Sequence, residues 1–289
     1  MAVKENSGAG QAPVPAIQRT HFLGVPFDRI TFNDVVALID LMREFDGFRY
    51  VVTPNVDHVV RFSGSRELRA CYENAWLTVC DSKPLVLLAR LMPLTLPRVT
   101  GSDLTASLFG NVIRDGDRIT IIAPNEAVVE KMRAKYPRLH IRAHVPPFGV
   151  GDNPAELARC IEFAVAEKAD FVFIAIGAPQ SEKIAYAMSK NKRASGICLC
   201  VGASLEFITG MKRRAPRWMR KVGIEWMHRL ASDPRRLWRR YAFAIVPLLR
   251  LTVAEFRQRR KVRTASGGYG AGAQGSQSFG DKSDVKTRG

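Results

Sequence analysis

The strongest candidate for acid–base chemistry in this sequence is an aspartate at the end of an apolar run. Asp81 directly follows Leu77–Cys80. Burial next to such a run raises the pKa of a carboxyl group, which suits a general base. Alternatively, Asp81 caps the helix expected to begin near Pro84, with Lys83 as a nearby charge. The residue types alone leave both interpretations open.

Polar or glycine-rich loops follow three further apolar runs. They are Thr53-Pro54-Asn55, Gly177-Ala178-Pro179-Gln180 and Gly202-Ala203. If the runs are parallel strands, these loops and Asp81 meet at one edge of the sheet, where open α/β sheets bind ligands. The segment after Gln180 is a predicted helix, whose first N–H groups suit a phosphate or a nucleobase carbonyl. Each loop taken alone is more simply an ordinary turn.

Motifs that would indicate a metal or a common nucleotide loop have simpler explanations or are absent. Asp115-Gly116-Asp117 has the DxD form that chelates Mn²⁺ or Mg²⁺ in many sugar-nucleotide transferases, but it precedes a predicted strand, and Asp-Gly is a common turn sequence. The five histidines and five cysteines lack the spacing of metal ligands. No GxGxxG follows a predicted strand, and GxxxxGK[ST] does not occur. We therefore predict no metal site and no cofactor.

The elements that would position these residues alternate along the chain. Helix-start signals stand at Ser102, Asn125 and Asn153-Pro154, each before a helical pattern. Between the helices, short runs apolar on both faces are typical of buried parallel strands. This alternation predicts an α/β fold with a doubly wound, mostly parallel sheet. The predicted strands are residues 22–27, 49–53, 77–80, 118–123, 140–144, 171–176 and 196–201.

The positive charge of the 289-residue chain, +17 in total, is concentrated near its C-terminus. Residues 205–263 hold 17 Lys or Arg and 4 Asp or Glu, and Trp218, Trp226, Trp238 and Tyr241 stand among the arginines. Aromatic residues of this kind favour the lipid–water interface, and arginine pairs with phosphate. The segment predicts an anionic membrane surface as partner, with a homo-oligomer interface as the alternative. It fits no DNA-binding motif, so nucleic acid is not an expected partner.

Composition also predicts the organisation and location of the protein. Residues 1–18 and 264–289 have little to bury and are expected to be disordered. We expect a catalytic domain at 19–205 and a basic helical appendage at 206–263. The N-terminus lacks the apolar stretch of a signal peptide, and no run approaches the roughly 20 residues that span a bilayer. With scattered cysteines that suggest reduced thiols, this predicts a cytoplasmic protein, peripheral on the membrane.

Several segments resemble the WecG/TagA/CpsF glycosyltransferases, glycosyltransferase family 26. They are VVTPNVDHVV (51–60), the Asp81 loop, RVTGSDL (98–104), GAPQSEK (177–183) and residues 201–241 with their RAP, EWxxRL and DPRRxxRY elements. The resemblance covers roughly residues 20–245. It implies a Rossmann-like domain with a C-terminal appendage. It also implies inverting, metal-independent sugar transfer from a UDP-sugar to a polyprenyl-diphosphate-linked saccharide at the inner membrane face, in cell-surface or exopolysaccharide biosynthesis.

The resemblance also implies roles for individual residues. Asp81 matches the base that deprotonates the acceptor hydroxyl, and Thr53 and Asn55 match the sugar pocket. Arg98 matches an arginine facing the acceptor or diphosphate. The remaining substrate-binding positions are Thr100 and Gly101 beside it, with Gly177, Gln180, Gly202 and Ala203 on the nucleotide side. The appendage arginines expected over the pyrophosphate are Arg214, Arg229, Arg236 and Arg240.

The chemistry agrees with these assignments, and one residue departs from the family pattern. UDP is a tolerable leaving group, so one base plus charge stabilisation from arginines and a helix N-terminus suffices. The donor sugar stays open between N-acetylmannosamine, its uronic acid and glucose. The family usually has Asp-Gly where this chain has Asp81-Ser82; because serine disfavours positive φ, the geometry of this loop stays open. The alternative function is a non-catalytic UDP-binding or anionic-lipid-binding module.

Overall fold

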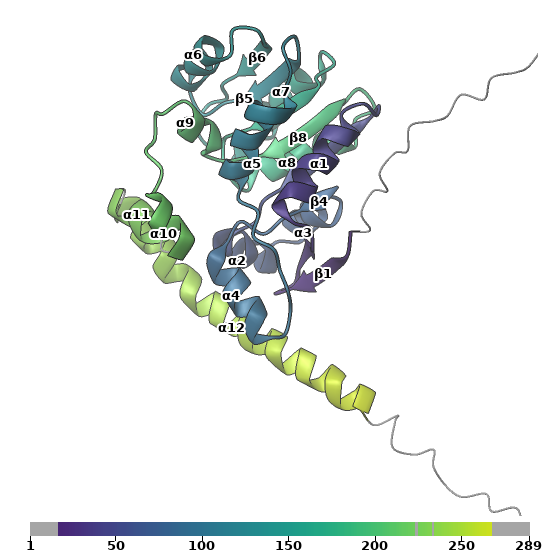
Figure 1. The fold of residues 1–289 in the computed structure, drawn as a ribbon, viewed down its shortest axis with the longest axis vertical. Helices are drawn as coiled ribbons and strands as arrows, with labels where there is room; N and C mark the ends of the chain where they lie inside the picture. Colours follow the sequence, from purple (N-terminus) through teal and green to yellow (C-terminus); the bar gives the residue numbers. More distant parts are fainter. Residues whose placement is uncertain (1–16, 223–224, 233, 268–289) are drawn as a thin grey trace, which may run out of the picture.

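A parallel sheet of six strands forms the centre of the protein (Figure 1). The computed structural model describes residues 17–222, 225–232 and 234–267. The strand order is β4-β3-β8-β7-β5-β6, and every neighbouring pair is parallel. The predicted α/β class with a doubly wound parallel sheet is therefore confirmed. The strands are β3 (Phe48–Val52), β4 (Leu77–Thr78), β5 (Arg118–Ile122), β6 (His140–His144), β7 (Phe171–Ile174) and β8 (Gly196–Cys200).

Both faces of the sheet are covered, which explains why its strands are apolar throughout. In β7, Phe171 and Phe173 pack into one buried cluster, whereas Val172 and Ile174 pack into another. This alternation follows from the opposite directions of successive side chains in a strand. The first face carries α1 (Phe32–Met42), α5 (Gly101–Ser107) with its π-helical continuation η1 (Leu108–Val112), α6 (Glu126–Lys135) and α9 (Ser204–Ile208). The second carries α2 (Val56–Gly64), α3 (Arg66–Glu73), α4 (Lys83–Leu91), α7 (Pro154–Val165) and α8 (Gln180–Ser189).

Two of the three predicted helix starts are confirmed. Asn125 caps α6 by accepting a hydrogen bond from the Val128 N–H, and Asn153 caps α7. The prediction at Ser102 is wrong by two residues, because Thr100 caps α5. Its hydroxyl accepts from the Asp103 N–H and donates to the Asp103 carboxylate at 2.6 Å. The Thr100 hydroxyl thus satisfies a backbone N–H in the first turn of α5, which is the role of an N-cap residue.

The strand predicted at residues 22–27 is wrong. The segment is part of an antiparallel hairpin outside the main sheet, β1 (Arg19–Phe22) paired with β2 (Val25–Asp28). The chain reverses at Leu23 and Gly24, which both have positive φ. The Asp28 carboxylate accepts hydrogen bonds from Arg19 and from the Thr78 N–H of β4, each at 2.8 Å, and so attaches the hairpin to the edge of the sheet.

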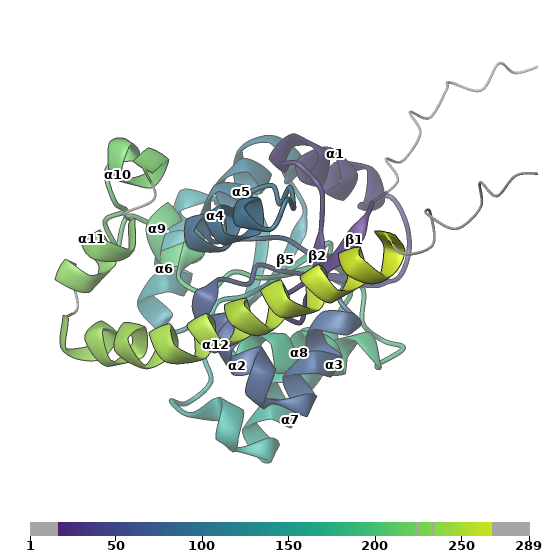
Figure 2. The same cartoon turned by 90° about the horizontal axis from the view of Figure 1, so that it is seen from below.

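Three helices follow the α/β body, as the basic segment predicts: α10 (Arg217–Val222), α11 (Glu225–Ser232) and α12 (Pro234–Gly267). Viewed from below, α12 runs across the end of the molecule (Figure 2). It packs on α2, and Leu248 and Leu251 contact the buried cluster beneath it. Near its end, Arg259 donates to the His21 carbonyl oxygen at 2.8 Å. The predicted disordered ends lie largely outside the described residues, but residues 264–267 continue α12.

Candidate functional site

The loops predicted to converge follow four adjacent strands. Asp81 comes after β4, Thr53 after β3, Gly202 after β8 and Gly177 after β7, and these strands are consecutive neighbours in the sheet. Because the strands are parallel, their carboxyl ends meet at one edge. Residues far apart in sequence are thus brought together where α/β sheets bind ligands.

Asp81 lies where three segments of the chain meet. Its Oδ2 accepts a hydrogen bond from the Gly101 N–H at 3.1 Å, and its own N–H donates to the Pro54 carbonyl oxygen at 3.0 Å. The residue before it, Cys80, forms an isolated parallel β-bridge with Arg98. The side chain is partly buried. The Gly101 N–H thus holds the carboxylate, and the Pro54 carbonyl oxygen holds the backbone of the same residue.

Ser82, rather than Asp81, caps α4. Its hydroxyl accepts from the Leu85 N–H at 3.3 Å, so the helix-capping interpretation of Asp81 is wrong. Ser82 has a φ of −154°, which is extended backbone that serine adopts readily. Ser82 thus occupies this loop without a positive φ, and it starts the helix that follows Asp81.

Thr53 and Gly101 are in close contact beside Asp81. A Cβ on Gly101 would lie 2.9 Å from Thr53 Oγ1, so a side chain there would force the two segments apart. Thr53 Oγ1 also donates to the Cys200 carbonyl oxygen of β8 at 3.4 Å. Asn55, two residues on, caps α2 and accepts from the Asp57 N–H. Thr53 thus contacts the same Gly101 whose N–H binds Asp81, whereas the Asn55 side chain is used as a helix cap.

Arg214 joins the C-terminal segment to this site. Its Nη1 lies 2.6 Å from Asp103 Oδ1, and its Nη2 donates to Thr100 Oγ1 at 3.3 Å. Thr100 directly precedes Gly101, whose N–H binds Asp81. The backbone of Arg98 pairs with Cys80, the residue before Asp81. The Nη2 atom of Arg98 lies 3.7 Å from the Glu225 carboxylate of α11. Two predicted phosphate-binding arginines are thereby placed near the base.

For the other predicted appendage arginines, the structure shows only the helices to which they belong. Arg229 belongs to α11, and Arg236 and Arg240 belong to α12. Their side chains lie outside what the structure describes. Their expected contact with a pyrophosphate stays a prediction.

The loops predicted to bind the nucleotide follow β7 and β8 and lie at the same carboxyl edge of the sheet. Gly177 and Gly202 have positive φ values of 83° and 51°, which glycine adopts without strain. Ala203 is the residue before α9, and Gln180 is the first residue of α8. The Gln180 side chain packs on Gly151 so closely that a Cβ there would not fit. Its Oε1 is buried without a hydrogen-bond partner in the described part of the chain.

A buried acid near these loops was not predicted. Glu182 lies in the first turn of α8, and its Oε1 is 3.6 Å from Nε2 of His58 in α2. Nδ1 of His58 accepts from the Asn55 N–H at 3.3 Å, which puts the ring proton on Nε2, facing the glutamate. The Asn55 loop and the start of α8 are thus linked through one imidazole. No sequence spacing relates residues 58 and 182, and only the adjacency of the elements could have indicated the contact.

Replacing Glu182 by glutamine should flatten the pH dependence of stability. Burial raises the pKa of this carboxyl from 4.5 to about 7, with Asp57 adding to the rise and Arg61 opposing it. The folded state therefore binds the proton more tightly than the unfolded state. Wild-type stability should fall as pH rises from about 4.5 to about 7, by on the order of 2–3 kcal/mol from this group. Urea unfolding of wild type and Glu182→Gln at pH 5 and pH 8 measures the difference.

The matched control is Glu162→Gln, because Glu162 is an exposed acid paired with Arg193. It should follow the wild-type pH profile. If the Glu182→Gln and wild-type profiles run parallel instead, folding does not raise the pKa of this carboxyl.

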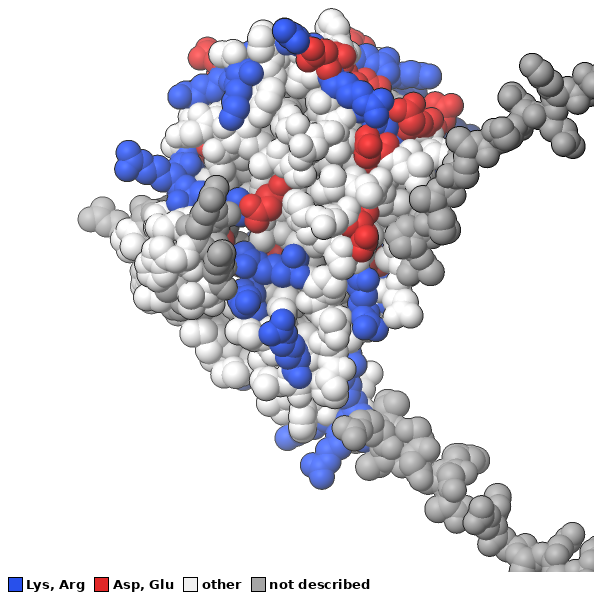
Figure 3. All heavy atoms as spheres, in the orientation of Figure 1, with Lys and Arg blue, Asp and Glu red and all other residues white. Residues whose placement is uncertain are grey.

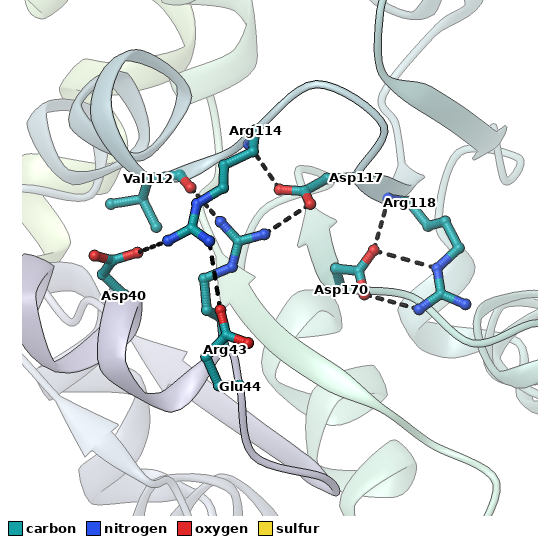
Figure 4. A network of polar contacts seen from close by, with 8 residues as sticks. All are labelled: Asp40, Arg43, Glu44, Val112, Arg114, Asp117, Arg118 and Asp170. Atoms are coloured by element: carbon teal, nitrogen blue, oxygen red, sulfur yellow. Dashed lines mark hydrogen bonds and ion pairs between the residues drawn. The ribbon is translucent and has the colours of Figure 1, made fainter. Parts of the chain in front are cut away.

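The Asp115-Gly116-Asp117 motif lies at the opposite edge of the sheet and is a turn, as predicted. Gly116 has a φ of +89°, and Asp117 binds Arg43 and the Arg114 N–H (Figure 4). In the same network Asp170 binds Arg118 in front of β7. The carboxylates of this edge hold loops together. Across the described ranges, no group of three or more His, Cys, Asp or Glu side chains is placed to hold a metal ion.

A surface cavity of about 700 Å³ lies beside the first residues of β5 and β6, away from the converging loops. Its lining includes Arg118, Arg142 and Tyr136. Arg118 is paired with Asp170, and Arg142 with Glu167. The cavity therefore lies at the amino ends of these strands, opposite the loops that carry the predicted site residues.

The fold is that of an α/β protein whose loops converge at the carboxyl edge of a parallel sheet, the edge at which such sheets bind ligands. The sequence profile described as "Glycosyl transferase WecG/TagA/CpsF family" matches residues 20–262, and the chain belongs to this family. The predicted resemblance is thus confirmed, as is the enzyme class: the protein is a glycosyltransferase, consistent with a hexosyltransferase.

Two relatives carry the name N-acetylglucosaminyldiphosphoundecaprenol N-acetyl-beta-D-mannosaminyltransferase. The relative from Bacillus subtilis (strain 168) is 26% identical over 187 residues, which cover 63% of this chain and 69% of the relative. The relative from Staphylococcus aureus (strain MW2) is 24% identical over 273 residues, which cover 92% of this chain and all of the relative. The similarity to the second relative therefore includes the C-terminal helices.

Proposed function

We propose that the protein transfers N-acetylmannosamine from its UDP derivative to a polyprenyl-diphosphate-linked saccharide, with inversion, in cell-surface polysaccharide synthesis. The observation that carries the proposal is the placement of Asp81. Its carboxylate is fixed by the Gly101 N–H at the edge of the sheet where Thr53, Gly177 and Gly202 also lie. A single positioned carboxylate is what an inverting transfer requires.

In the proposed reaction, the acceptor hydroxyl attacks the anomeric carbon while its proton passes to Asp81. The bond from that carbon to the UDP oxygen breaks, and UDP leaves with the additional negative charge. Arg214 and Arg98 are within reach of this region and would stabilise the charge on the diphosphate. The loops at Gly177 and Gly202 and the start of α8 at Gln180 would hold the nucleotide.

The relatives' names support the choice of donor and acceptor. Both describe an N-acetylmannosaminyl transfer to an N-acetylglucosaminyl diphosphate carried on undecaprenol. They favour N-acetylmannosamine over the uronic acid and over glucose, which the sequence left open. A UDP-linked donor is the form that the family resemblance implies.

A lipid-linked acceptor requires the enzyme to meet a membrane, and the exposed face of α12 supports such a contact. Val246, Leu249, Val253 and Phe256 recur at helical spacing along this face and are each about half exposed. Exposed arginines flank them, including Arg250, Arg257 and Arg260. Apolar side chains bordered by arginines suit an anionic bilayer surface. Among the described helices, none is long and apolar enough to cross a membrane. We therefore propose peripheral association with the inner membrane face.

The test is UDP release from UDP-N-acetylmannosamine, UDP-N-acetylmannosaminuronic acid and UDP-glucose, with and without a polyprenyl-diphosphate-N-acetylglucosamine acceptor, in the presence of EDTA. We expect acceptor-dependent release from the first donor only. Release from another donor instead would overturn the sugar assignment. If UDP binds but no pair turns over, the protein is the non-catalytic binding module.

A further inference from the structure

The helix that follows the candidate base carries an apolar pair on its outer side. In α4, Leu85 and Ala89 are buried, whereas Leu87 is 48% exposed and Leu91 is 73% exposed. Residues 87 and 91 are one helical turn apart and so lie on the same face. A single exposed leucine needs no explanation, but two adjacent ones beside a catalytic loop form a small apolar surface.

The surroundings of this pair are basic. Residues 83–98 contain Lys83, Arg90 and Arg98 and no acidic residue. Figure 1 places α4 and α12 at the same end of the molecule, and Figure 3 shows mainly uncharged atoms, Lys and Arg on that end, with Asp and Glu gathered towards the other. An apolar pair within positive charge complements an anionic lipid surface.

The helix that carries the pair also lies close to α12. Both views show α4 beside α12 (Figures 1 and 2), and Leu88 of α4 packs against the same buried cluster as Leu248 and Leu251 of α12. The two helices are therefore anchored on one core, and a surface that binds α12 also comes close to α4.

We propose that Leu87 and Leu91 form a second membrane contact, on the catalytic body itself, and insert into an anionic bilayer next to α12. The inference rests on the proposed function, since a lipid-linked acceptor is the reason for the catalytic body to touch the membrane. α4 begins two residues after Asp81, and its nine residues span about 14 Å. The leucine pair therefore lies within one short helix of the candidate base, and a membrane bound there would bring a lipid-linked acceptor close to Asp81.

The experiment uses the full chain with Leu87→Ser and Leu91→Ser combined. Binding is measured by co-sedimentation with phosphatidylglycerol-containing vesicles and with phosphatidylcholine vesicles. We expect the double variant to bind the anionic vesicles about tenfold more weakly, because burying even part of two leucine side chains contributes that much. Residual binding through α12 should remain. The matched control is Phe45→Ser: Phe45 has the same 48% exposure but lies before β3, at the opposite edge of the sheet.

Activity separates this inference from the proposed function. On a water-soluble short-chain acceptor, the double variant should work at the wild-type rate, and on the acceptor in vesicles it should be slower. Unchanged vesicle binding would overturn the inference. So would a loss of self-association with vesicle binding intact, since the leucines would then cover a second copy of the chain. If no protein transfers sugar at all, the proposed function fails, while the vesicle comparison still decides the role of the leucine pair.

Discussion

Replacing Asp81 by asparagine should reduce sugar transfer by about a thousandfold while leaving the fold unchanged. Removing a general base typically costs 10²- to 10⁴-fold in rate. Asparagine keeps an oxygen that can accept the hydrogen bond from the Gly101 N–H, so the local structure should persist. Acceptor-dependent UDP release, measured with thermal unfolding on the same preparations, checks both statements.

The control for this variant is Asp115→Asn. Asp115 is an exposed aspartate at the other edge of the sheet, paired with Arg138, and its loss should leave the rate unchanged. Binding of UDP to Asp81→Asn should stay at the wild-type affinity, because the proposed role of the carboxylate is with the acceptor hydroxyl. Wild-type turnover in the variant would show that another group is the base.

Replacing Arg214 by alanine should lower kcat/KM by about 10²- to 10³-fold. Its guanidinium reaches from the segment after α9 to Thr100 and Asp103, one residue from the backbone N–H that holds Asp81. Loss of a positioned donor for developing negative charge costs this much in comparable sites. Arg214→Lys should recover only part of the activity, since lysine keeps the charge but cannot form both bonds with one planar group. Steady-state kinetics with varied acceptor measures the effect.

Arg213 provides the adjacent control, because it is exposed whereas Arg214 is partly buried. Arg213→Ala should remain within about threefold of wild type, as expected for a surface charge. If both variants lose activity equally, the segment acts through its net charge and the specific position of Arg214 is irrelevant.

The sheet and the edge that carries the site could be predicted because their signals are local. A run such as residues 171–176 is apolar on both faces, and a strand buried between two layers of helices requires this composition. Once the strands are parallel, the position of Asp81, Thr53, Gly177 and Gly202 follows from chain direction alone. The hairpin at residues 19–28 escaped prediction because its turn, Leu23-Gly24, stands inside a continuous apolar stretch.

The contacts within the site could not be predicted, because they join distant parts of the chain. Arg214 and Asp103 are 111 residues apart, and His58 and Glu182 belong to helices that meet only when the sheet has formed. In the sequence, Glu182 is only one acid within the helix predicted after Gln180. Its burial depends on the packing of α2 and α3 over α8, which no local pattern encodes.

The network at the amino end of the sheet has a consequence for how this protein can change over evolutionary time. Asp117, Arg43 and Asp170 tie that end together, whereas the ligand loops leave from the other end. The candidate loops and these ion pairs thus lie at opposite ends of the strands, so a loop can change in sequence while the ion pairs persist.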